Sequence, residues 1–173
     1  MARLDRSEVL DAAFELAQES GLGAVSLRRV ADRLGVTPMA LYRHVRDKDD
    51  LLDGLADLLY GELELPVPGA GWWDGFAAAA RSTRKVLLAH PWAVPLFGRP
   101  IAGPNGEALN DALRSSLRAA GFSARETEEL HDQLASMVFA LVAPELHGKR
   151  NRAAFERGIE MLRAGLAARL RQQ

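Results

Sequence analysis

A glycine turn between two short amphipathic segments is the feature that most restricts how this chain can fold. Ser26 is followed by apolar residues at intervals of three and four, which predicts a helix with Ser26 as its N-cap. The buried face of this helix would comprise Leu27, Val30, Ala31 and Leu34. Gly35 stands just past its end, where left-handed backbone favours glycine. Thr37 caps a further helix with Pro38 at its first position, so the region predicts a helix-turn-helix.

Helices on either side of this motif complete the N-terminal part of the chain. Asp5 and Glu8 have the spacing of a capping box, which begins a helix that ends before Gly21. Its apolar face would comprise Leu10, Ala13, Phe14 and Ala17. Asp47 caps a fourth helix that continues to about Leu63 and is apolar on two sides. A helix of this kind should contact both the motif and the part of the chain that follows.

The remaining sequence also has helical spacing, interrupted by proline and glycine. Helices are predicted over residues 73–89, 107–120, 124–143 and 152–171, with Pro144 ending the third of them. Residues 66–71 form a candidate linker, and residues 91–106 a loop with a short helical piece. We therefore predict an all-α protein with a three-helix helix-turn-helix head, residues 1–48, and a helical body, residues 49–173.

Composition favours a packed helical protein and argues against an enzyme. Hydrophobic residues make up 48% of the chain and charged residues 26%, and there is no cysteine. No two of the four histidines have metal-ligand spacing, and Glu128 with His131 is at most half a site. We find no glycine-rich phosphate loop and no nucleophile motif, so no catalytic residue, metal ligand or cofactor is predicted. No apolar run is long enough for a membrane helix, and no leader is evident, so we expect a cytoplasmic protein.

Basic residues gather in the helix-turn-helix although the net charge of the chain is −1. Residues 26–48 contain Arg28, Arg29, Arg33, Arg43, Arg46 and Lys48 against Asp32 and Asp47, a local charge of +4. A solvated helix face would also have this composition. A local positive patch is nevertheless what phosphate binding needs, because salt screens charges that lie farther away.

The helix after the turn has an outer face suited to DNA. With 100° between residues, Leu41 and Val45 lie together while Met39 and Arg43 point the opposite way. Arg43 could bond guanine through two acceptors, and apolar side chains could contact a thymine methyl group. The predicted DNA-binding residues are Arg28, Thr37, Pro38, Met39, Ala40, Tyr42, Arg43, His44 and Lys48. Tyr42 and His44 are candidates for phosphate contacts, as is Lys48 in the first turn of the next helix.

Two helices of the body carry stripes suited to helix packing. One stripe comprises Leu130, Leu134, Met137 and Leu141, and the other comprises Phe155, Ile159, Leu162 and Leu166. Beside the second stripe lie the small residues Ala154, Gly158, Gly165 and Ala168, which allow close approach of a neighbouring helix. These stripes fit the core of one chain or a bundle shared by two. The dimer is favoured because a helix-turn-helix head generally needs a partner.

These motifs resemble the TetR family of repressors. The resemblance is carried by residues 26–36 and by Pro38-x-Ala-Leu-Tyr-Arg-His-Val-x-x-Lys48. Weaker similarity to the tetracycline-repressor branch includes Trp73-x-x-Phe76, Gly121-Phe122-Ser123 and Phe155-x-x-Gly158. The resemblance implies a repressor that binds a palindromic double-stranded DNA operator as a homodimer, joined through the helices near 125–143 and 155–171. It also implies a small-molecule effector that binds the body and releases the DNA.

The predicted ligand-binding residues form a mostly apolar set with a few polar groups, as concave binding sites do: Phe76, Arg84, Trp92, Phe97, Arg99, Leu113, Gln133 and Met137. Aromatic residues at helical spacing also fit an ordinary hydrophobic core. Tetracycline repressors use a histidine shortly before an Arg-Pro pair, whereas here residues 95–98 precede Arg99-Pro100 without one. Ala80 stands where that branch has an amide, and the segment 144–153 is shorter. We therefore expect a different effector, with an apolar or planar molecule favoured over a metal-bound tetracycline. The alternative function is a helical protein that binds or sequesters a small molecule without regulating DNA.

Overall fold

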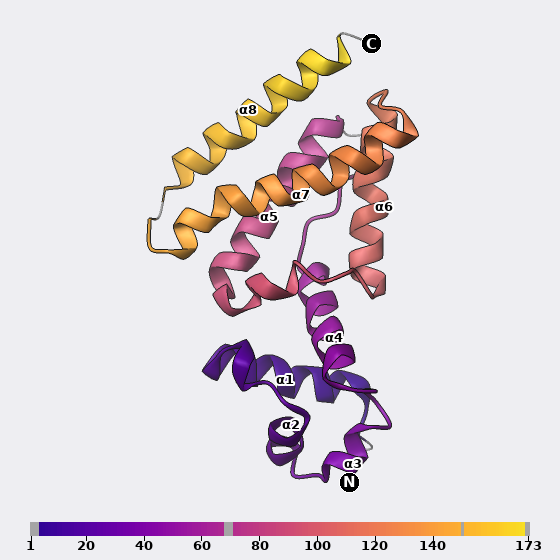
Figure 1. The fold of residues 1–173 in the computed structure, drawn as a ribbon, viewed down its shortest axis with the longest axis vertical. Helices are drawn as coiled ribbons and strands as arrows, with labels where there is room; N and C mark the ends of the chain where they lie inside the picture. The colour runs from indigo at the N-terminus through magenta and orange to yellow at the C-terminus, as the bar shows by residue number, and fades with distance from the viewer. Residues whose placement is uncertain (1–3, 68–70, 150, 172–173) are drawn as a thin grey trace. The chain divides into compact units, whose positions relative to one another are not determined.

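The computed structural model describes residues 4–67, 71–149 and 151–171, and this part of the chain is helical with no strand (Figure 1). The prediction of an all-α protein is confirmed. The elements are α1 Arg6–Ser20, η1 Leu22–Ala24, α2 Leu27–Leu34, α3 Pro38–Leu41, α4 Lys48–Gly61, α5 Trp72–Ala89, η2 Pro91–Leu96, α6 Pro104–Ala119, α7 Ala124–Leu146 and α8 Arg152–Leu170. The predicted linker at 66–71 lies partly outside the described residues.

The chain divides into two compact units, and the first of them is discontinuous in sequence. It comprises the chain through Gly61 together with His90–Gly106, so it holds α1 to α4 and η2. The second comprises Glu62–Ala89 and the chain from Glu107 onward. A functional boundary between residues 48 and 49 remains a prediction. We refer to the two parts as the first unit and the second unit.

Local signals set the helix ends of the first unit as the sequence predicts. The Asp5 carboxylate accepts the Glu8 N–H at 3.0 Å, and the Glu8 carboxylate accepts the Asp5 N–H at 3.0 Å, which completes the capping box. Ser26 caps α2 by accepting the Arg29 N–H at 3.3 Å. Gly35 has φ 66° and ψ 31°, the left-handed conformation predicted after α2. Thr37 differs from the prediction, since its side chain makes no capping bond to α3.

The core of the first unit lies among α1, α2, α3 and α4. Its fully buried side chains include Val9, Val30, Leu41, Val45, Leu51, Leu55 and Leu59. Helix α4 crosses α1 at Gly54, which is buried and lies against Leu10. The absence of a side chain at Gly54 therefore allows the two helices to approach closely. On the second predicted apolar side of α4, Leu51 is fully buried and Leu58 is half-buried.

The second unit is built on α7, which packs against α5 and α8. The buried stripe of α7 comprises Leu130, Leu134, Val138 and Val142, and α8 contributes Phe155, Ile159 and Leu166. The predicted stripe on α7 is therefore corrected after Leu134, because Met137 is 44% exposed and Val138 takes the inward position. In a helix with 3.6 residues per turn, the residues three and four positions after Leu134 point to different sides. Both of them, Met137 and Val138, are apolar, so the sequence allowed either one as the next buried residue.

Three helix ends differ from those predicted, and one of them is the start of α6 at Pro104, three residues before the predicted residue 107. Helix α7 continues through Pro144 to Leu146, so that proline does not end it. Pro144 has no N–H to donate to the Ala140 carbonyl, so the last turn of α7 lacks one backbone bond. The Pro144 carbonyl accepts the Lys149 N–H at 3.0 Å. Helix α4 ends at Gly61, two residues before the predicted Leu63.

Candidate nucleic-acid interface and effector-binding residues

The outer surface of α2 and α3 presents the predicted DNA-binding residues to solvent. Met39 is 74% exposed and Tyr42 is 52% exposed, whereas Leu41 and Val45 are fully buried. Seven of the nine predicted residues are exposed, and Ala40 and His44 are half-buried. Helix α3 spans only Pro38–Leu41, so Tyr42, Arg43 and His44 lie in the turn that follows it. The inward and outward faces are those predicted from the 100° rotation.

Cations on this surface differ in how freely they can reach a ligand. Arg28, Arg43 and Lys48 are exposed, and none of the three is in an ion pair with a described residue. Arg33 instead pairs with Glu15 at 3.0 Å and with Glu19, both on α1. The predicted +4 patch therefore overstates the charge available to DNA, because two carboxylates of a neighbouring helix neutralise Arg33. Side chains that are cationic, exposed and unpaired are suited to phosphate oxygens or guanine.

A carboxylate beneath this surface is held in its ionised form. The Asp50 side chain is 13% exposed and accepts hydrogen bonds from both terminal nitrogens of Arg6, at 2.9 and 3.2 Å. Asp50 also accepts the backbone N–H of Arg46 at 2.8 Å. These bonds, that from Arg6 above all, lower the pKa of Asp50 from 3.8 to about 2.

We expect this carboxylate to stabilise the first unit above about pH 4 and to lose that contribution as the pH falls toward 2. The sign follows from a pKa that is lower in the folded chain than in the unfolded chain. We expect about 1 kcal/mol, because Arg6 is 43% exposed and solvent screens the pair. Urea unfolding of the wild type and of Asp50→Asn across pH 2 to 5 measures it. The difference in unfolding free energy should shrink with falling pH, and a constant difference would contradict the assignment.

Three of the predicted ligand-binding residues belong to the first unit, where they join the segment 90–106 to α1 and α4. Arg99 pairs with Asp53 at 2.8 Å and with Asp49 at 3.1 Å, both on α4. The Trp92 indole N–H donates to Gln18 on α1 at 2.9 Å. The ring of Phe97 contacts that of Tyr60 with centroids 5.0 Å apart. Each of these side chains therefore already has a partner within the first unit.

Asp57 continues the row of α4 carboxylates in which Asp49 and Asp53 pair with Arg99. It lies one turn after Asp53 on α4 and accepts the backbone N–H groups of Asn105 and Gly106 at 2.9 and 3.0 Å. These are the first N–H groups of α6, so Asp57 serves as its N-terminal cap. Three acidic side chains spaced four residues apart on α4 therefore hold the segment 99–106.

The other predicted ligand-binding residues lie in the second unit. Phe76 is buried against Trp73 with ring centroids 5.2 Å apart, and Leu113 is half-buried on α6. Arg84 makes two bonds to the buried Glu145, Nε to Oε1 at 2.8 Å and Nη2 to Oε2 at 2.7 Å. Its guanidinium also lies 5.6 Å from the ring centre of Phe155 on α8. The residues Phe76, Arg84 and Leu113 therefore take part in packing within this unit.

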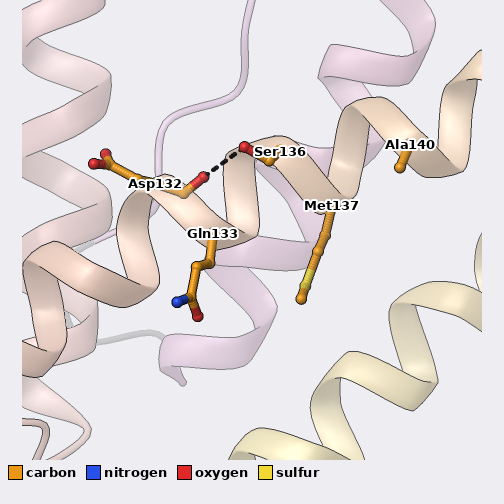
Figure 2. A pocket seen from close by; sticks show the side chains of 5 residues that line it. All are labelled: Asp132, Gln133, Ser136, Met137 and Ala140. Carbon is orange, nitrogen blue, oxygen red and sulfur yellow. Dashed lines mark hydrogen bonds between the residues drawn. The ribbon is translucent and has the colours of Figure 1, made fainter.

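Gln133 and Met137 line an open groove of about 470 Å³ on α7, together with Asp132, Ser136 and Ala140. Figure 2 shows Gln133 and Met137 projecting from the same side of the helix, while the Ser136 hydroxyl donates to the Asp132 carbonyl at 3.0 Å. All five side chains are exposed. The eight predicted ligand-binding residues thus fall into separate groups, and their role in binding stays a prediction.

Family models match nearly the whole chain. Residues 9–55 match the model described as bacterial regulatory proteins, tetR family. Residues 65–170 match the tetracyclin repressor-like C-terminal domain. The chain belongs to the TetR family. The resemblance inferred from residues 26–48 is thereby confirmed, and the family is one of transcriptional regulators rather than enzymes.

Relatives of this TetR-family chain include characterised regulators. An HTH-type transcriptional regulator of Saccharopolyspora erythraea is 38% identical over 82% of this chain and 61% of its own length. The transcriptional repressor DrrR1 of Streptomyces coeruleorubidus is 36% identical over 69% of this chain and 45% of its own. The chain thus spans less than two thirds of either relative. The class A tetracycline repressor from transposon 1721 of Escherichia coli is 32% identical over 99% of this chain and 80% of its own.

Solved structures of TetR-family proteins have the same fold. ActR of Streptomyces coelicolor, in complex with (S)-DNPA, superposes with a TM-score of 0.83 at 28% identity and covers 96% of this chain and 98% of its own. The structure of BioQ with its double-stranded DNA operator has a TM-score of 0.78 at 26% identity. The match covers 95% of this chain and 99% of the BioQ chain. None of the described helices is long and apolar enough to cross a membrane.

Several residues that matter in this TetR-family chain escaped sequence reasoning. Arg6 and Asp50 are 44 positions apart, and Arg84 and Glu145 are 61 apart, so no local spacing connects either pair. A signal exists for Glu145, because a charged residue beside the apolar run of residues 137–143 indicates a buried partner. Arg6 and Asp50 are charged residues at helix starts and gave no such signal.

Proposed function

We propose that this protein is a homodimeric transcriptional repressor that binds a palindromic DNA operator and is released from it by a small molecule. The observation that carries the proposal is a set of three cations that are exposed and unpaired among the described residues: Arg28 on α2, Arg43 in the turn after α3 and Lys48 at the start of α4. Met39 and Tyr42 extend the same surface with apolar and hydroxyl groups. In a helix-turn-helix, such side chains contact base edges and phosphates. With this function the chain acts in the cytoplasm, where it meets DNA.

Residues of the second unit support the homodimer. Met161 on α8 is 75% exposed and Met137 on α7 is 44% exposed, and small residues such as Gly165 and Ala140 are exposed on the same two helices. Large apolar side chains of this kind are usually buried in a partner when small neighbours allow close approach. We propose that α7 and α8 of two chains form a bundle. A two-fold dimer would present two heads to a palindrome.

We further propose that the effector binds without a metal ion and is planar and largely apolar. Related structures contain ActR with actinorhodin and a variant of TetR from Acinetobacter baumannii AYE with minocycline. In this chain, residues 95–98 supply no histidine, and aromatic rings gather at Trp72, Trp73, Phe76 and Phe122. An effector lowers DNA affinity if it binds more tightly to a dimer conformation in which the spacing of the two heads does not match the operator. Helix α4 and the segment it holds are candidates for that coupling.

Selection of bound fragments from genomic DNA, followed by affinity measurements at several salt concentrations, tests the DNA-binding function. We expect a palindromic site, and an affinity that falls with a log–log slope of about −0.9 per neutralised phosphate. Arg43→Ala should reduce operator affinity by about 10- to 100-fold and relax the preference at one position of each half-site. Lys48→Ala should weaken all DNA similarly and reduce the slope.

Lys85→Ala serves as the matched control, because Lys85 is an exposed cation on α5 in the second unit and should leave both measurements unchanged. Intact dimers that bind DNA weakly and without a preferred sequence would contradict the proposal. That result would favour a helical protein that binds or sequesters a small molecule instead.

A further inference from the structure

The proposed base-reading residues lie on a segment that cannot hold its own conformation. Helix α3 has four residues, and its N-cap Thr37 makes no side-chain bond. One turn of helix is unstable alone, because too few hydrogen bonds offset the lost backbone entropy. Tyr42 and Arg43 come after this turn, where local support comes from the His44 and Val45 N–H groups bonded to the Leu41 carbonyl. Contacts from elsewhere in the fold must therefore fix residues 42–46.

Arg6 and Asp50 supply such contacts from two other helices. Arg6, at the start of α1, donates from Nη1 to the His44 carbonyl at 2.6 Å. Asp50, in the first turn of α4, accepts the Arg46 N–H at 2.8 Å. The two side chains also bond to each other at 2.9 and 3.2 Å. Their hydrogen bonds to residues 42–46 go to backbone groups, and Asp50 also pairs with the Arg46 guanidinium at 3.6 Å. These contacts fix the path of the chain and leave the side chains of Tyr42 and Arg43 free.

We propose that Arg6 and Asp50 are positioning residues for operator recognition. They hold the turn 42–46 so that Arg43 meets the bases and Tyr42 meets the phosphates in one orientation, and they contact no base themselves. This inference rests on the proposed function. It predicts that discrimination between the operator and unrelated DNA depends on the pair, while general attraction to phosphates does not, because Arg28, Arg43 and Lys48 remain in place.

Arg6→Ala is the first test, measured as affinity for the selected operator and for a scrambled duplex over a range of salt. We expect about 10- to 100-fold weaker operator binding, with less than about threefold change for the scrambled duplex and an unchanged salt slope. A slope reduced by about 0.9 for each head would mean that Arg6 contacts phosphate directly, and it would overturn the proposal. Equal losses on both duplexes would do the same, since they indicate general damage to the head.

Conservative variants and a matched control separate positioning from charge and from folding. Arg6→Lys keeps the charge but lacks the planar fork of two nitrogens that reaches the His44 carbonyl and both Asp50 oxygens, so it should also lose discrimination. Asp50→Asn keeps the shape of the side chain and should show the same loss even if Arg6→Ala fails to fold. Arg33→Ala removes an arginine of the same unit whose ion pairs go to Glu15 and Glu19 on α1. It should retain discrimination.

The outcomes also separate this inference from the function on which it rests. A wild-type protein without sequence preference would overturn the proposed function and this inference together. A wild-type preference that Arg6→Lys and Asp50→Asn both leave intact would overturn the inference alone. A double-mutant cycle on operator affinity should show that the effects of Arg6→Ala and Asp50→Ala are not additive, because each residue depends on the other.

Discussion

Glu145→Leu should lower the unfolding free energy by about 3 kcal/mol, because it leaves the charge of Arg84 without its partner. The two side chains are 3% and 20% exposed and are joined by bonds of 2.7 and 2.8 Å. Arg84 lies on α5, Glu145 near the end of α7, and the Phe155 ring on α8 packs against the guanidinium. One ion pair therefore connects three helices of the second unit. Urea denaturation followed by tryptophan fluorescence measures the effect.

The double variant Arg84→Met with Glu145→Leu is the informative companion. Buried ion pairs replaced together by apolar residues of similar size are often neutral, because the desolvation of both charges is relieved. We expect the double variant to recover most of the stability lost by Glu145→Leu. Equal destabilisation in the single and the double variant would show that shape at position 145, rather than the unpaired charge, determines the loss.

Met137→Glu combined with Met161→Glu should convert the proposed dimer to monomers and weaken operator binding by more than about 100-fold. Both methionines are exposed in the single chain, so the substitutions leave its core intact. In a bundle of two chains, four carboxylates would be buried without partners. Sedimentation velocity would report the oligomeric state, and operator titration would report the loss of paired heads.

Val67→Glu provides the control for these substitutions. Val67 is 68% exposed and lies between α4 and α5, outside the surface of α7 and α8. It should leave both mass and DNA affinity unchanged. A protein that stays dimeric with glutamate at 137 and 161 would locate the dimer contact elsewhere and remove these faces from the proposal.

Features that depend on a few neighbouring residues were predictable from the sequence. The capping box at Asp5, the left-handed Gly35 and the inward Leu41 all follow from local chemistry, and the structure contains each of them. These signals are strong because a cap or a positive φ involves one turn of chain. They were sufficient to predict the helix-turn-helix and to orient its outer face.

Features that depend on distant partners were not predictable in the same way. Arg33 adds to the positive patch in the sequence, but Glu15 and Glu19 lie beside it in the structure. Arg99 and Trp92 bond to Asp53 and Gln18 within the first unit, and no local spacing indicates these partners. Their role as effector contacts stays a prediction. The choice between Met137 and Val138 as the inward residue likewise depends on which side of α7 meets α5 and α8. Local spacing carries no information on such pairings.

The discontinuity of the first unit affects how its parts can be made and exchanged. Asp49, Asp53 and Asp57 on α4 bond to residues 99–106, which the ribosome adds only after the whole of α5. A nascent chain that has just completed α4 therefore lacks the groups that these carboxylates bind, and the unit closes late in synthesis. A chimaera that takes its head from a relative and joins the two chains directly after α4 would separate these three carboxylates from their partners. Those partners are Arg99, Asn105 and Gly106. A graft that preserves native contacts must carry both stretches.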